Sequence, residues 1–99
     1  MAKYDVYKFG DKNHLVLDVQ TDLLADLNTR IVVPLMPKDE APKPAKYLNP
    51  LFKVDGNQYV MVTQFLSAVP ALKLSHAIGN LNDNASEITR ATDMVFQGF

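Results

Sequence analysis

Apolar and polar residues alternate in the first third of the chain with the two-residue period of β-strands. Residues 4–9 place Tyr7 and Phe9 on one face and Tyr4 and Val6 on the other, whereas residues 15–19 place Leu15, Leu17 and Val19 on a single face, as a half-buried strand does. Between them, residues 10–13 have the sequence Gly-Asp-Lys-Asn, a cluster typical of turns. We therefore expect a β-hairpin with a polar tip.

The next segment predicts a short turn, a strand and a long loop. Thr21 can cap a single helical turn, and residues 30–35 are rich in β-branched side chains. Pro34 has no N–H to donate, so it should lie at a sheet edge or a bulge. Residues 36–50 contain four prolines and predict a long irregular connection, of a kind that is usually functional or mobile.

Two further β-segments follow. Residues 51–54 and 58–63 predict a second hairpin, because the Asp-Gly-Asn sequence at residues 55–57 suits a turn with positive φ. Another short strand is expected at residues 69–74, with Pro70 at an edge or at the strand start.

The C-terminal segment changes to the period of a helix. Asn84 and Glu87 form a capping-box pattern, and apolar residues recur at spacings of three and four from Ile88 to Val95. Gly98 stands where a helix is expected to end. The fold class is therefore expected to be mostly β (α+β), with one C-terminal helix.

Composition narrows the class of protein. A chain of 99 residues with an apolar fraction of 47% fits one globular domain, residues 1–99. The absence of cysteine and of a signal-peptide pattern predicts a cytoplasmic protein, and no apolar run is long enough for a membrane span. With a net charge of −1 and only Arg30 and Arg90 as arginines, the chain alone is expected to bind nucleic acid poorly.

No pattern of catalytic residues is present. Thiol chemistry is excluded without cysteine, and His14 and His76 do not lie in the sequence context of a serine triad or at the spacing of metal ligands. The glycines are scattered at turns and form no phosphate-binding loop. We therefore expect no enzyme, no metal and no other cofactor.

Several short motifs, in order, resemble the CcdB toxins. They are residues 17–24 (Leu-Asp-Val-Gln-Thr-Asp-Leu-Leu), 30–35 (Arg-Ile-Val-Val-Pro-Leu), 61–63 (Met-Val-Thr), 68–70 (Ala-Val-Pro) and 94–99 (Met-Val-Phe-Gln-Gly-Phe). Each motif alone is weak, but their order and spacing hold across nearly the full chain. Small length differences fall in the first hairpin and in the proline-rich loop.

The resemblance implies a fold and a function. The expected fold is an SH3-barrel-like antiparallel sheet with a second small sheet and a C-terminal α-helix, shared with the MazF ribonucleases and assembled as a homodimer. CcdB-like toxins trap the DNA gyrase A subunit in its DNA-cleavage complex. A CcdA-like antitoxin removes the toxin, and the two together repress their own operon, with DNA contacted only through the antitoxin complex.

The resemblance also implies two groups of binding residues. The gyrase-binding group is Thr21, Leu23, Leu24, Asp93, Phe96, Gln97, Gly98 and Phe99. The antitoxin-binding group is the hairpin tip, Phe9, Gly10, Asp11, Lys12, Asn13 and His14, and we expect the loop at residues 36–50 to respond to the antitoxin as well. From composition alone, Leu23 and Leu24 could equally be core residues.

Two positions in the gyrase-binding group are notable. Gln97 stands where the family pattern has tryptophan, a typical interface anchor, and the exchange removes about 2–4 kcal/mol of binding energy unless another group compensates. Asp93 places a carboxylate in the last turn of the helix, where it opposes the helix dipole at a cost of roughly 0.3–1 kcal/mol.

Two alternative functions stay open at this point. A non-poisoning relative would bind antitoxin without trapping gyrase, and the substitution at Gln97 favours this reading. A MazF-like mRNA endoribonuclease would need a basic groove with a positioned arginine, for which Arg30 is the candidate within the matching strand.

Overall fold

The computed structural model describes residues 1–10 and 14–98, which form seven strands, one α-helix and four 3-10 turns. The strands are β1 (Asp5–Lys8), β2 (Leu15–Asp18), β3 (Thr29–Pro37), β4 (Leu51–Val54), β5 (Asn57–Met61), β6 (Ser67–Pro70) and β7 (Ala77–Asn80). The helix is α1 (Ala85–Gln97), and the 3-10 turns are η1 (Asp22–Leu24), η2 (Thr63–Phe65), η3 (Ala71–Lys73) and η4 (Asn82–Asn84). The expected class, mostly β with a C-terminal helix, is confirmed.

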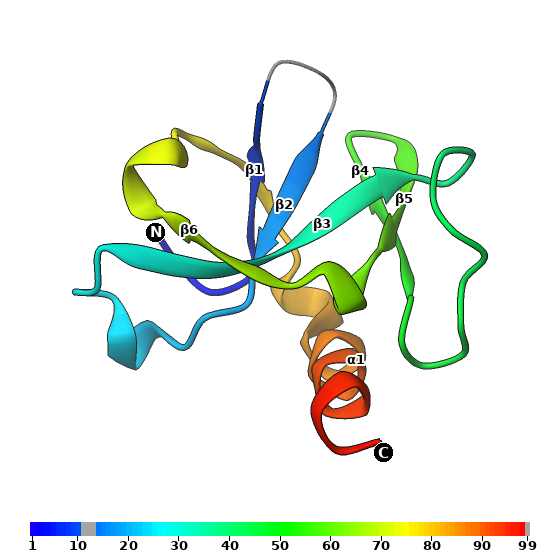
Figure 1. The fold of residues 1–99 in the computed structure, drawn as a ribbon. Coiled ribbons are helices and arrows are strands. Elements are labelled where there is room, and N and C mark those ends of the chain that lie inside the picture. The colour runs from blue at the N-terminus through cyan, green and yellow to red at the C-terminus, as the bar shows by residue number, and fades with distance from the viewer. Residues whose placement is uncertain (11–13, 99) are drawn as a thin grey trace.

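Strand β3 is the centre of the sheet (Figure 1). The antiparallel strand order is β4-β5-β3-β2-β1-β7, and β6 branches from β3. Along one side β3 pairs with β2, and along the other it pairs first with β6 and then with β5. Within the described residues, a single curled sheet with β6 as a branch therefore replaces the separate second sheet that we expected.

Pro34 lies where β3 changes partner. Pairing with β6 ends at Val32 and pairing with β5 begins at Leu35, and the Pro34 carbonyl in this gap accepts from the N–H of Val62 at 2.9 Å. Within a strand, the N–H and the C=O of one residue point to the same side. The N–H that Pro34 lacks would therefore point into the gap between β6 and β5, where neither strand needs a donor. The expected position at an edge or a bulge was therefore wrong, because Pro34 lies on the central strand and pairs with Val16 of β2 in regular register.

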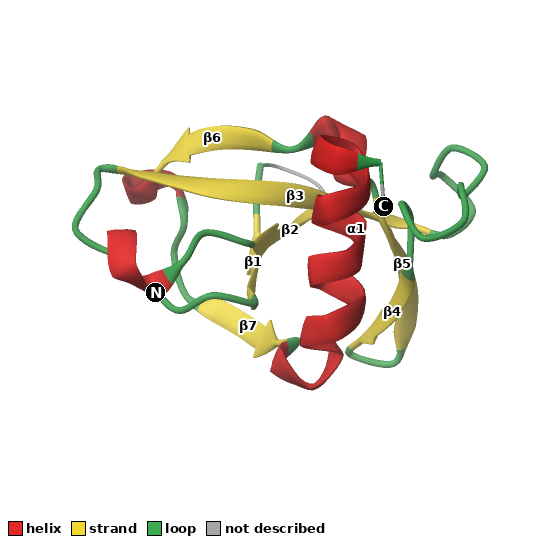
Figure 2. Ribbon diagram, turned by 90° about the horizontal axis from the view of Figure 1, so that it is seen from below, coloured by secondary structure: helices red, strands yellow, loops and turns green. Residues whose placement is uncertain are grey.

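Both faces of the sheet are covered. Helix α1 crosses one face (Figure 2) and completes the larger core cluster, while the segment around β6 and η3 covers the other. The larger cluster is Val6, Leu15, Leu17, Val33, Leu35, Phe52, Val54, Met61, Leu81, Ile88 and Ala91. The smaller cluster is Tyr7, Val16, Val32 and Leu74. The expectation that β2 is half-buried was wrong, because its alternating residues supply both clusters.

Most turns and helix ends form at the positions that the sequence predicts. Asp55 and Gly56 have φ values of +50° and +81° in the β4–β5 turn, and Gly98 ends α1 with φ +80°. The capping box differs, because Asn84 precedes the helix but donates its side-chain amide to the Glu87 carboxylate at 3.2 Å. The strand expected at residues 69–74 ends at Pro70, and β7 was not predicted, because it is short, mostly exposed and interrupted by Gly79.

A buried ion pair joins β2 to β3. The Arg30 guanidinium is 1% exposed and donates from Nε to Oδ2 of Asp18 at 2.8 Å, with Nη2 2.6 Å from the same oxygen. The backbone N–H of Gln20 donates to the other Asp18 oxygen at 3.0 Å. Burial raises the pKa of the Asp18 carboxyl above its ordinary value, and the hydrogen bonds from Gln20 and Arg30 oppose that rise. The pair holds two charges away from water on the central strands.

A second polar cluster connects β1 with β7. The Asp5 carboxylate accepts from the Asn80 side chain at 2.9 Å, from the backbone N–H of Ala2 at 2.9 Å and from the Tyr7 hydroxyl at 3.2 Å. Burial acts to raise the pKa of Asp5, but these hydrogen bonds outweigh it and lower the pKa below its ordinary value. Burial, followed by the charge of Asp5, raises the pKa of Tyr7 to about 12.

Replacing Arg30 with methionine should strongly destabilise the protein. The substitution leaves the buried Asp18 carboxylate without its partner, and we expect a loss of about 3–5 kcal/mol in the free energy of unfolding. The double variant Arg30→Met/Asp18→Leu should recover most of that loss, because no buried charge is left unpaired. Urea denaturation measures both values, and parental stability in the single variant would contradict the role of the pair.

The free energy of unfolding should decrease as pH rises above the ordinary tyrosine pKa. The unfolded chain releases the Tyr7 proton near pH 10, whereas the folded chain keeps it until about pH 12. Between these values the folded state binds more protons, so the free energy of unfolding decreases as pH rises. Tyr7→Phe should flatten this slope in denaturation curves at pH 10–12, and an unchanged slope would show that another group controls it.

Candidate functional site

The turn that carries Leu23 and Leu24 is built from short-range polar contacts. The Thr21 hydroxyl accepts from the N–H of Leu23 at 3.3 Å, so Thr21 caps η1 as its sequence predicts. The buried Gln20 side chain donates to the carbonyl of Leu24 at 2.9 Å and accepts from the N–H of Ile31 at 3.1 Å. We call residues 21–27 the η1 arm, and these contacts fasten it to β3.

The η1 arm presents apolar side chains to solvent. Leu23 is 92% exposed and Leu24 is 48% exposed, and Leu27 on the same arm is also exposed. Of the two readings that composition left open, the core position is therefore excluded for Leu23 and Leu24. Exposed leucines on a held backbone are suited to contact another protein.

The end of α1 presents a second exposed group. Ile88 and Ala91 turn to the core, whereas Phe96 is 71% exposed and Gln97 and Gly98 are also exposed. The N–H of Gly98 donates to the Met94 carbonyl at 3.1 Å, so the helix ends at this glycine as predicted. Asp93 is half-buried in the last turns of the helix. Phe99 lies outside the described residues.

The two exposed groups lie apart within one chain. In Figures 1 and 2 the η1 arm is at the end of the molecule that holds the N-terminus, and the C-terminal end of α1 is on another side. A single chain therefore does not bring the two predicted groups into one continuous patch.

The hairpin tip borders an apolar hollow. The N–H of Phe9 donates to the carbonyl of His14 at 2.9 Å, and Gly10 has φ +83°. Phe9 and His14 line a cavity of about 310 Å³ together with Pro34, Phe65 and Val69. Of the predicted antitoxin-binding residues, Phe9, Gly10 and His14 thus border this cavity or the adjoining turn, and Asp11, Lys12 and Asn13 lie outside the described residues.

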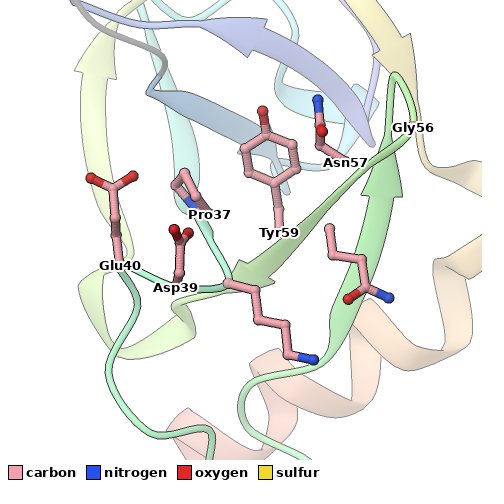
Figure 3. A pocket seen from close by; sticks show the side chains of 8 residues that line it. Pro37, Asp39, Glu40, Gly56, Asn57 and Tyr59 are labelled. Carbon is pink, nitrogen blue, oxygen red and sulfur yellow. The ribbon is translucent and has the colours of Figure 1, made fainter.

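A wide hollow with both polar and apolar lining was not anticipated from the sequence. Figure 3 shows Asp39 and Glu40 at one end of it and Asn57 at the other, with Tyr59 between them, in a space of about 770 Å³. Within residues 1–10 and 14–98, no cluster of histidine and carboxylate side chains is arranged to hold a metal ion. The same part of the chain has no helix that is long and apolar enough to cross a membrane.

One further contact joins segments that no sequence motif connects. The Arg90 guanidinium carbon on α1 lies 3.6 Å from the ring centroid of Tyr47, which belongs to the proline-rich loop. These two residues, Met94 and Gly98 line a small cavity of about 280 Å³ at the end of the helix. The only sequence signal was their side-chain types, because tyrosine and arginine are common in protein interfaces.

The chain was compared with models of known protein families. The model of the CcdB protein family matches residues 3–98, so it covers the hairpin, the η1 arm, the central strands and α1. The motifs that suggested the resemblance all fall within this range, apart from the final Phe99. The chain belongs to the CcdB family, toxins of toxin–antitoxin systems.

Proposed function

We propose that this toxin binds the DNA gyrase A subunit and traps its DNA-cleavage complex. The observation that carries the proposal is the exposure of Leu23, Leu24 and Phe96, apolar residues at positions where the family resemblance expects gyrase contacts. A soluble protein that keeps large apolar side chains in water on well-held backbone is suited to protein recognition.

Binding alone is sufficient for such an activity. A protein ligand shifts an equilibrium by its differential affinity for the two states. A toxin that binds the cleaved gyrase–DNA complex more tightly than the resealed one therefore raises the population of broken DNA without any chemistry of its own. This mode of action needs no catalytic residue and no cofactor in the toxin, and it places the protein in the cytoplasm with its target.

The placement of the η1 arm and the α1 end favours a homodimer. Strand β6 hydrogen-bonds to β3 along one edge, and η2, whose last residue Phe65 is exposed, packs against α1. A two-fold axis near the end of α1 would present two helix ends together. The gyrase-binding surface would then be composed of both chains, which accommodates the separation of its two parts in one chain.

The hairpin tip is proposed to bind the CcdA-like antitoxin. The support is the apolar cavity beside Phe9 and His14, because a disordered peptide gains most from inserting an apolar side chain into a preformed hollow. Phe65 and Val69 line the far side of the same hollow. Operator binding would be a property of the complex, since the toxin carries a net charge of −1.

The ribonuclease alternative is disfavoured by the position of its candidate arginine. Arg30 is buried and paired with Asp18, so it cannot reach a phosphate in solvent without breaking the ion pair. A non-poisoning relative that binds only antitoxin remains the second candidate, because Gln97 replaces the tryptophan anchor.

Expression in a bacterial host with wild-type gyrase should arrest growth and induce the DNA-damage response. This outcome follows from unsealed double-strand breaks, and a damage-responsive reporter measures it. Growth arrest with RNA decay and no damage signal would instead indicate the ribonuclease. Normal growth, with antitoxin binding retained, would identify the non-poisoning relative.

A chain lacking residues 97–99 is the matched control. It should be non-toxic, while its free energy of unfolding stays within about 1 kcal/mol of the parent, as is usual for surface changes. Gln97→Trp should tighten binding to the purified gyrase A subunit at least about tenfold, which corresponds to about 1.4 kcal/mol. A truncated chain that folds and still kills would place the toxic surface elsewhere.

The protein should sediment as a dimer at micromolar concentration. An isologous interface of this kind is expected to bury on the order of 1,200–2,000 Å². Analytical ultracentrifugation should therefore give twice the chain mass of 11.1 kDa. A mass of one chain at that concentration would exclude a binding surface composed of two copies.

A further inference from the structure

The turn that carries Tyr47 is fastened to the sheet by one buried side chain. Asn49 accepts from the N–H of Ala45 at 3.0 Å and donates to the carbonyl of Met61 at 3.0 Å and to the Gln64 side chain at 2.8 Å. The Thr63 hydroxyl also donates to the carbonyl of Leu48. This part of the proline-rich loop is therefore held in place, although the loop is long and rich in proline.

Tyr47 adopts a backbone conformation that its side chain disfavours. Its φ of +67° lies in the left-handed region, which is uncommon for an aromatic residue and costs about 1–3 kcal/mol. The ring is nevertheless 42% exposed, so burial in the core does not explain the conformation. Strain of this kind at an exposed residue is a common feature of binding sites.

The strained backbone directs the ring onto the end of α1. The Arg90 guanidinium carbon is 3.6 Å from the ring centroid and the Lys46 ammonium is 5.0 Å from it. Both distances are within the range of cation–π attraction. The planar Arg90 group can stack on the ring and still expose N–H donors at its edge.

The stacked pair lies directly beside the tail that the proposed function assigns to gyrase. Tyr47 and Arg90 line the small cavity together with Met94 and Gly98, the residue that follows Gln97. At Gln97 itself the aromatic anchor of the family pattern is missing. An exposed aromatic ring is thus placed beside the position that lacks one.

We propose that Tyr47, positioned by Arg90, is the aromatic anchor of the gyrase-binding surface and compensates for glutamine at position 97. The inference rests on the proposed function and adds residues from the proline-rich loop to its site. The exposed part of the ring would give the gyrase A subunit apolar contact area, and Arg90 and Lys46 beside it add two cationic groups to the same surface. Tyrosine and arginine at the rim of a small cavity are residues that commonly carry interface energy.

The test compares four variants for affinity to the purified gyrase A subunit and for stability in urea. Tyr47→Asn deletes the ring but retains a residue that tolerates positive φ, and it should weaken binding at least about tenfold. Tyr47→Phe keeps the ring and should retain binding within about threefold of the parent. Arg90→Gln should weaken binding, because it releases the ring and removes the charge. Lys53→Gln is the control, because Lys53 is exposed on β4 and belongs to neither of the two proposed binding groups.

A fifth variant tests compensation itself. In the Tyr47→Asn background, Gln97→Trp should restore most of the lost affinity, because one aromatic anchor replaces the other. Unchanged binding by Tyr47→Asn with parental stability would overturn the anchor role and leave the gyrase assignment standing. Absence of binding by the parent chain itself would overturn the gyrase assignment, and the anchor role with it.

Discussion

The buried contact between Asp18 and Arg30 constrains the centre of this protein. Two opposite charges away from water are tolerated only when they are paired, and here Nε of Arg30 and the N–H of Gln20 donate to the two oxygens of the Asp18 carboxylate. Beyond the close contact of Nη2 with Asp18, the two Nη atoms of Arg30 have no hydrogen-bond partner among the described residues. Arg30 lies on β3, which pairs with three other strands, and Asp18 lies at the end of β2, where the chain turns into the η1 arm. The ion pair therefore fixes where the sheet ends and where the arm begins.

The η1 arm and the end of α1, which carry the exposed apolar residues, are both held against the sheet. Gln20 follows Asp18 and holds the η1 arm through the Leu24 carbonyl, while Ile88 and Ala91 hold α1 on the sheet and leave Phe96 outside. Binding orders few additional groups when the contact residues are already held, and this reduces its entropic cost.

Positive φ angles occur in this chain at turns and a helix end, and also at the aromatic residue Tyr47. At Asp55, Gly56 and Gly98 the left-handed conformation is required by a hairpin turn or a helix end. At Tyr47 it occurs in a loop turn, where a glycine or asparagine would be less strained. The Tyr47 turn is also closed by a backbone hydrogen bond, from the N–H of Asn49 to the carbonyl of Ala45 at 3.0 Å, but here the left-handed residue is a bulky aromatic whose ring lies against Arg90.

The sequence by itself determined the features that depend on near neighbours. Alternation predicted both hairpins, Thr21 its capped turn and Gly98 the helix end, because each depends on a few consecutive residues. The ordered motifs also identified the family, which the family match confirms. The tertiary structure alone decided that β2 is covered on both faces, that the seven strands form one branched sheet, and that β7 joins its edge. It also decided that Leu23 is exposed, that Arg30 is buried and that Tyr47 meets Arg90. These facts depend on which distant segments pack together, and local periodicity carries no information about packing partners.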